Sequence, residues 1–176
     1  MLPVGPLMIE HRLIERMVEV MRKELDRMER AGDADPQLIE KAVDFIRTYA
    51  DRCHHGKEED ILFRELGKKS LSAEHAGIMK ELKEEHRLGR KITTQLAQAG
   101  EGYLKGKKET FTSIADSMKR LVELYPSHIE KEDKHFFLPV MEYFSDEEIK
   151  SMLEEERDFD RQLIHLKYRE MVKALE

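Results

Sequence analysis

The sequence predicts an all-α protein, an up-down-up-down four-helix bundle with an additional C-terminal helix. Glu, Lys, Leu, Arg and Met, which are good helix formers, dominate the composition. No segment shows the apolar-polar alternation of a strand, whereas four long segments carry apolar residues at the spacings of a buried helical face. The 176 residues suffice for one hydrophobic core. We expect residues 1–144 to form the bundle and residues 145–176 a helix that packs on the bundle or on a partner.

Composition and charge argue against several classes of function. The net charge is -6 and the basic residues are interspersed with acidic ones, which argues against a nucleic-acid partner. No apolar run approaches the length of a membrane span, and the first residues lack the charged start of a signal peptide. The single cysteine, Cys53, can form no disulfide within the chain, which fits a reducing compartment. We therefore expect a cytoplasmic protein with no membrane and no nucleic-acid partner.

The first two helices are predicted to form a hairpin. Residues 7–31 carry apolar residues at alternating spacings of four and three, and His11 occupies one position of that face. Gly32 interrupts the pattern. The Asp35-Pro36 pair then supplies an N-cap and a first helical residue for a helix over residues 36–66.

The third helix is predicted to begin after Ser70 or Ser72, either of which can cap it. His86 lies on its apolar face. For the third and fourth helices to match in length, the third must continue to about Leu104 in spite of its glycines.

Prolines shape the fourth helix. Pro126 should kink it just before His128, and Pro139 should end or bend it. Ser145, followed by acidic residues, is a fresh N-cap, so a single further helix is expected to run to about Leu175.

The sequence repeats one pair of motifs. EHRL occurs at residues 10–13 and again at residues 85–88. Each copy precedes a segment that reads His, three residues, Glu-Asp, two residues, Phe, at residues 55–63 and 128–136. A His and a Glu four residues apart stack on one helical face, where they can bind one metal ion. Two helical hairpins that close on each other are therefore predicted.

Two registers compete in the second helix. At 100° per residue, His55 and Glu59 lie close to the apolar face, whereas His54 lies on the opposite face. This phase favours the pair His55 and Glu59 over the pair His54 and Glu58. Ligation by His54 is left open.

The fourth helix gives the same offsets for His128 and Glu132, although Asp133 is left open as a ligand. The distances of the histidines from the predicted turns place four of them within about a turn of one layer. The expected metal ligands are two carboxylates and these four histidines: His11, His55, Glu59, His86, His128 and Glu132.

The type of ligand limits the type of metal. Imidazoles argue against calcium and magnesium, which prefer oxygen ligands, and six side chains are too many for one tetrahedral zinc ion. Two ions bridged by Glu59 and Glu132 fit best, and iron is the usual occupant of such sites in helical bundles.

Taken together, the motifs EHRL, CHHGKEEDILF, EHRLGR and YPSHIEKEDKHFF resemble those of the hemerythrin-like, HHE cation-binding family. The resemblance covers about residues 7–144. It implies a four-helix bundle with two non-haem iron ions, bridged by carboxylates and by an oxo or hydroxo group, that binds dioxygen or a related small molecule. By position, it implies one iron on His11 and His55 and the other on His86 and His128.

The third helix departs from the family pattern, because Arg90 stands where hemerythrin has a second histidine. A guanidinium cannot coordinate iron, so Arg90 is expected to turn aside and pair with an acidic residue. The leading hypothesis is a protein that binds or senses dioxygen, nitric oxide or iron. The alternatives are a di-iron enzyme that acts on peroxide or other reactive species, and a metal-stabilised bundle that forms a homodimer through its C-terminal helix.

Overall fold

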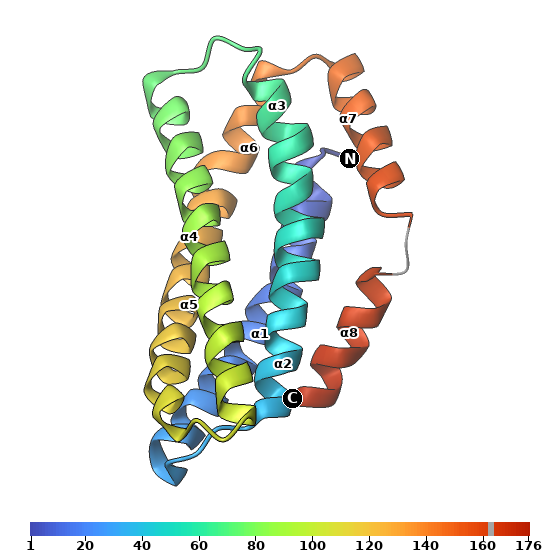
Figure 1. Cartoon of the computed structure of the whole chain (residues 1–176). Helices are drawn as coiled ribbons and strands as arrows, with labels where there is room; N and C mark the ends of the chain where they lie inside the picture. Colours follow the sequence, from blue (N-terminus) through green and yellow to red (C-terminus); the bar gives the residue numbers. More distant parts are fainter. Residues whose placement is uncertain (162–163) are drawn as a thin grey trace.

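Four long helical segments lie side by side, and each runs in the direction opposite to the one before (Figure 1). This computed structural model describes residues 1–161 and 164–176, without the side chains of residues 164–166. No strand occurs among the described residues. The all-α, up-down-up-down bundle expected from the sequence is confirmed.

The first segment is α1 (Val4–Ala31), and it ends where the sequence pattern breaks. Gly32 adopts the left-handed conformation with φ 73°, and its N–H bonds to the carbonyl of Met28. The side chain of Asp35 then accepts from the N–H groups of Gln37 and Leu38, which caps the second segment as predicted.

The second segment contains long π-helical stretches, which the helical periodicity of the sequence does not predict. Backbone bonds in a π-helix span five residues instead of four, so the faces that side chains occupy shift relative to those of an α-helix. The segment consists of α2 (Pro36–Phe45), η1 (Ile46–His55), η2 (Glu58–Leu62) and α3 (Phe63–Leu66).

The third segment is α4 (Ala73–Leu104), which Ser72 caps and which continues through its glycines to Leu104, as expected. The fourth segment runs through Pro126 and changes to a π-helix four residues after His128. It consists of η3 (Lys108–Thr110), α5 (Phe111–Lys131), η4 (Glu132–Phe136), α6 (Phe137–Val140) and η5 (Met141–Tyr143).

The C-terminal region forms two helices where the sequence pattern predicted one. Ser145 makes a capping box at the start of α7 (Asp146–Phe159), and α8 (Ile164–Leu175) follows; the link at residues 162–163 lies outside the described part of the chain. The break lets the two helices reach different parts of the bundle. Met152 of α7 packs in one apolar cluster, and Tyr168 of α8 packs in the other.

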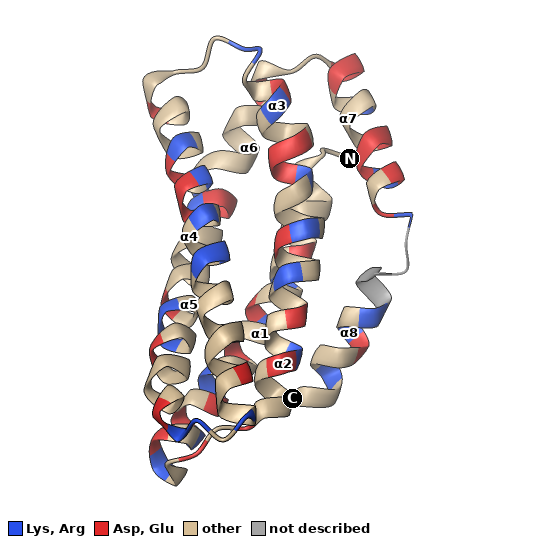
Figure 2. Cartoon of the chain, viewed as in Figure 1, with Lys and Arg blue, Asp and Glu red and all other residues tan. Residues whose placement is uncertain are grey.

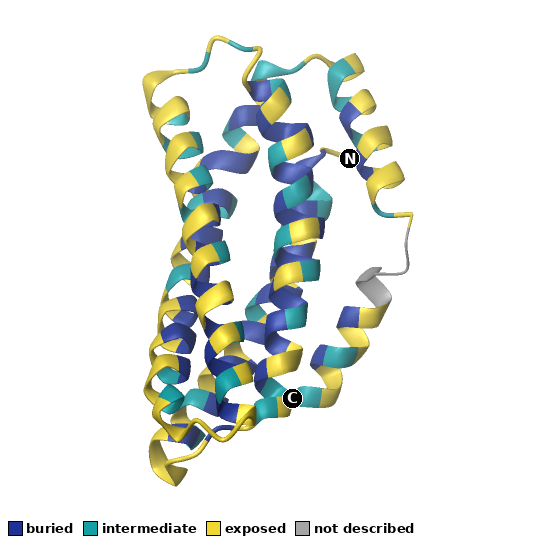
Figure 3. Cartoon of the chain, in the orientation of Figure 1, coloured by how far each residue is buried: buried dark blue, intermediate teal, exposed yellow. Residues whose placement is uncertain are grey.

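A buried polar layer separates the two apolar clusters. Each of the four segments contributes to both clusters, with polar residues between its two contributions. Figure 3 shows the buried residues on the inner sides of the helices. The layer contains five histidines and two carboxylates: His11, His54, His55, His86, His128, Glu58 and Glu132. The clusters on both sides supply the apolar burial that holds this layer in place.

The outer surface is highly charged and mixed in sign. Figure 2 shows Lys and Arg interspersed with Asp and Glu along the helices, as the sequence indicates. None of the described helices combines the length and the apolar character that crossing a membrane requires.

Helix α7 brings a carboxyl group into the protein interior. Glu156 is 2% exposed, and neither of its oxygens has a hydrogen-bond partner among the described residues. The nearby ammonium of Lys57 is fully buried and pairs with Glu10 and Asp160. Burial raises the pKa of Glu156 to about 8, although Lys57 opposes the shift.

We predict that Glu156→Gln stabilises the protein at alkaline pH. The folded state holds Glu156 protonated up to about pH 8, whereas the unfolded chain ionises near 4.5. The free energy of unfolding therefore falls as pH rises between these values, by an amount on the order of a few kcal/mol. Gln does not ionise, so the variant avoids this loss. Thermal unfolding at several pH values measures it, with exposed Glu154→Gln as the control. A gain that does not grow with pH would contradict the assignment.

Candidate metal centre

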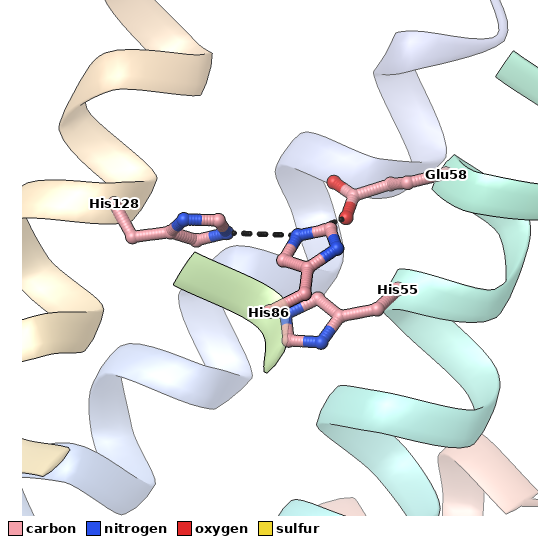
Figure 4. A group of neighbouring side chains, drawn as sticks. All are labelled: His55, Glu58, His86 and His128. Atoms are coloured by element: carbon pink, nitrogen blue, oxygen red, sulfur yellow. Dashed lines mark hydrogen bonds and ion pairs between the residues drawn. The ribbon is translucent and has the colours of Figure 1, made fainter. Parts of the chain in front are cut away.

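The polar layer gathers potential metal ligands into two buried groups that share one carboxylate. His11, His54, Glu58 and Glu132 form the first group. His55, Glu58, His86 and His128 form the second, which Figure 4 shows. Within each group, one ligand atom of every residue lies within 4.8 Å of the others.

Two carboxylates face both groups. Oε1 of Glu58 lies 3.3 Å from Nε2 of His54, and its Oε2 lies 3.3 Å from Nε2 of His86. Glu132 does the same, with Oε2 3.2 Å from Nε2 of His11 and Oε1 3.4 Å from Nε2 of His128. None of these four buried oxygens has a hydrogen-bond partner among the described residues. Such oxygens are costly to bury unless a cation lies between them.

A second set of carboxylates orients the imidazoles. Nδ1 of four histidines lies within hydrogen-bond distance of a carboxylate oxygen, which turns Nε2 toward the centre of the layer. Such contacts fix the ring and raise its basicity as a metal ligand. The pairs are His11 with Asp133 at 2.7 Å, His54 with Glu10 at 2.8 Å, His86 with Glu59 at 2.7 Å and His128 with Glu85 at 2.7 Å.

These contacts relate two halves of the chain by an approximate twofold symmetry. The first unit, residues 10–59, matches the second unit, residues 85–133. Each contact between a carboxylate and Nδ1 of an orienting pair in one unit has its equivalent in the other, since Glu10 with His54 corresponds to Glu85 with His128. The remaining equivalences are His11 with His86, Glu58 with Glu132 and Glu59 with Asp133.

His55 has no equivalent in the second unit, because Ile129 follows His128. The ring of His55 stacks on His86 with centroids 3.9 Å apart. It gives the second group three imidazoles, whereas the first group has two. The ligand set is therefore asymmetric although the frame that carries it is symmetric.

Five of the six predicted ligands lie in these groups, and Glu59 does not. Its carboxylate accepts from His86 and Arg90 at the edge of the layer, and Glu58 occupies the shared position. His54, the alternative ligand of the second helix, joins the first group. Asp133, the alternative ligand of the fourth helix, contacts Nδ1 of His11 from outside the groups.

The π-helix explains the change of register. Glu10 and His54 are 44 residues apart, whereas Glu85 and His128 are 43 apart, so the first unit carries one extra residue. The π-helical stretch η1 accommodates it. An α-helical phase carried along this segment therefore selects Glu59, whereas the structure places Glu58 in the group. Three residues separate His54 from Glu58, and three separate His128 from Glu132. Aligning these two pairs gives the equivalence that the structure shows.

Arg90 behaves as its chemistry predicts. It turns away from the imidazoles, and its Nε donates to Asp51 at 2.7 Å while Nη2 donates to Glu59 at 2.9 Å. The expectation that Arg90 pairs with an acidic residue is confirmed. Arg90 thereby also holds in place Glu59, the carboxylate that orients His86.

The protonation states reflect this crowding of charge. Burial by itself lowers the pKa of His54, but Glu58 and Glu10 outweigh it and raise the value to about 10. Glu58 and Glu59 likewise raise the pKa of His86 to about 9 against the effect of burial. Burial and the neighbouring His86 keep the pKa of His55 well below its usual value. Without a metal, protons supply the positive charge that the two central carboxylates require.

The model of the hemerythrin HHE cation binding domain matches this chain over residues 2–137 and again over residues 82–175. The chain belongs to this family. The two matches overlap because the second one begins near residues 85–133, which repeat the pattern of residues 10–59. No curated protein and no solved structure matches the chain.

A cation fits the residues of this hemerythrin HHE domain. Imidazole nitrogens and carboxylate oxygens converge there, and the central carboxylate oxygens have no other partner among the described residues. The donor set suits transition metals better than magnesium or calcium. His11, His54, His55, His86, His128, Glu58 and Glu132 could hold such a cation.

We predict that metal binding at neutral pH releases protons. His54 and His86 hold protons there because their pKa values are about 10 and 9, and imidazole binds metal only after losing its proton. Metal affinity should therefore rise with pH up to about that range. Calorimetric titration with Zn²⁺ in buffers of different ionisation enthalpy measures the release. Heats that are independent of the buffer would contradict the assigned protonation.

Proposed function

We propose that this chain holds two iron ions and uses them to bind or sense a small molecule such as dioxygen or nitric oxide. The observation that carries the proposal is the position of Glu58 and Glu132, each of which directs one oxygen to either group of imidazoles. Carboxylates that reach two groups at once are suited to bridge two ions. Iron suits a mixed set of imidazoles and carboxylates in a helical bundle.

The two ions would differ in their protein ligands. One would be held by His11 and His54, and the other by His55, His86 and His128, with both central carboxylates shared. The ion with fewer imidazoles leaves more room for an external ligand. Bound iron would supply reversible electron donation to that ligand.

The surrounding protein keeps water out and holds the ligands in place. All five imidazoles are at most 4% exposed. Phe137 stacks against His11 with ring centroids 5.6 Å apart, which closes the first group on its apolar side. Carboxylates on Nδ1 keep each of four rings oriented before a metal arrives, so little ordering is required on binding.

A di-iron enzyme that consumes peroxide is the second candidate. The unequal ligand sets support it as well, because an open position can admit a reactant as readily as a reversible ligand. Steady peroxide consumption by iron-loaded protein would favour the enzyme. A reversible spectral change without consumption would favour the binding protein.

Two broader expectations belong to the proposal. A cytoplasmic location is supported by the single cysteine, whose thiol is buried and has its pKa raised to about 12 by that burial. Homodimerisation through the C-terminal region stays a prediction, since α7 and α8 pack against their own bundle with their inner faces.

We predict that anaerobic iron titration saturates at two equivalents per chain and that Glu58→Gln weakens the binding of both. Glu59→Gln, its neighbour, should weaken binding about 10–100-fold at the His86 side only, because Glu59 acts through the ring. Elemental analysis with near-ultraviolet absorption of the oxidised protein measures both. Saturation at one iron, or equal effects of the two substitutions, would refute the two-ion centre.

A further inference from the structure

His55 differs from the other four histidines on its outer side. Its Nδ1 is buried and has no hydrogen-bond partner among the described residues. The nearest carboxylate oxygen, Oδ1 of Asp51, is 3.5 Å away. That oxygen accepts from Nε of Arg90 at 2.7 Å. Among the described residues, Arg90 thus holds the carboxylate that is placed to orient His55 as the others orient their histidines.

A cavity of about 260 Å³ lies beside this contact. Its lining includes His55, Asp51, Arg90, Arg47 and Tyr125, which come from three of the four segments. Tyr125 is 4% exposed, so its ring forms one wall of the cavity.

The charges around the cavity favour an anion. Arg47 is exposed and forms no ion pair with any described residue. Arg90 uses Nε and Nη2 for its two carboxylates and leaves Nη1 without a described partner. Arg90 is paired with Asp51 in the lining and with Glu59 beside it, so Arg47 is the guanidinium of the lining that a bound anion would meet without an ion pair to a described residue.

The volume limits the size of the ligand. A water molecule takes up about 30 Å³, so the cavity of about 260 Å³ accommodates roughly nine waters or one small molecule in their place. Guanidinium groups bind planar oxyanions through paired N–H···O bonds, and a tyrosine hydroxyl can donate a further bond.

We propose that this cavity binds a small planar oxyanion, nitrite or a short carboxylate, between Arg47, Arg90 and Tyr125. The anion draws Arg90 away from Asp51. Asp51, which lies one turn before His55, then accepts the hydrogen bond of Nδ1. This last step rests on the proposed function, in which Nε2 of His55 faces the metal and Nδ1 carries the proton. The anion and the metal would then strengthen each other's binding, since linkage is reciprocal.

Titration of the metal-free full chain tests anion binding independently of the metal centre. Histidine-ring and backbone NMR would follow additions of sodium nitrite and of sodium acetate, with sodium chloride at equal ionic strength as the reference. We expect saturable changes of chemical shift around Arg90 and Tyr125 with one or both oxyanions. The oxyanion that binds more tightly identifies the ligand. Shifts that chloride reproduces, or none, would overturn the proposal even if the protein binds iron normally.

Matched variants locate the site. Arg47→Gln should weaken the binding about tenfold, the usual effect of losing a charge-assisted hydrogen bond. Arg52→Gln is the control, because Arg52 is exposed on the same segment and does not line the cavity. Tyr125→Phe should weaken binding less than Arg47→Gln does. Equal losses for Arg47→Gln and Arg52→Gln would mean general charge attraction and would overturn the site.

Asp51→Asn separates anion binding from its coupling to His55. Loss of the carboxylate should leave anion binding as tight or tighter, while the ring resonance of His55 no longer responds to the anion. In the unmodified protein, acetate or nitrite should also raise the affinity for Zn²⁺ several-fold. Unchanged Zn²⁺ affinity in an anion-bound protein would overturn the coupling.

Discussion

Two carboxylates buried among imidazoles dictate the design of this protein. Glu58 and Glu132 are fully buried, and their oxygens make no hydrogen bond of regular geometry to a described residue. An isolated buried carboxylate costs several kcal/mol, so positive charge has to lie between these groups. Protons on His54 and His86 supply it in the metal-free chain, and metal ions would supply it more effectively. The outer carboxylates then keep the imidazoles directed at the same points.

The internal repeat makes this arrangement possible in a chain of modest length. Each unit provides a Glu-His pair on one helix and a His-x3-Glu pair on the next. Carboxylates of one unit contact a histidine of the other, as Asp133 and Glu132 contact His11. Two apolar clusters flank the layer, so all four segments are anchored on both sides of it. The polar layer therefore interrupts the core without leaving either end of the bundle unpacked.

The bundle, its turns and most residues of the two polar groups could be predicted because they depend on local rules. Helical periodicity, the Asp35 and Ser145 caps and the break at Gly32 each follow from a few neighbouring residues. The choice between Glu58 and Glu59 could not be made this way, because the π-helix shifts the phase by an amount that tertiary packing determines. The break between α7 and α8 likewise depends on two clusters that no local pattern reveals.

Magnetic coupling between the two ions tests the central claim most directly. Ions that share Glu58 and Glu132 are close enough for their unpaired electrons to couple, whereas ions at separate sites are not. Low-temperature Mössbauer spectroscopy of the oxidised, iron-loaded protein in an applied field distinguishes these cases. The account predicts a diamagnetic ground state for the bulk of the bound iron. Magnetically split spectra of isolated ferric ions would contradict a carboxylate-bridged pair.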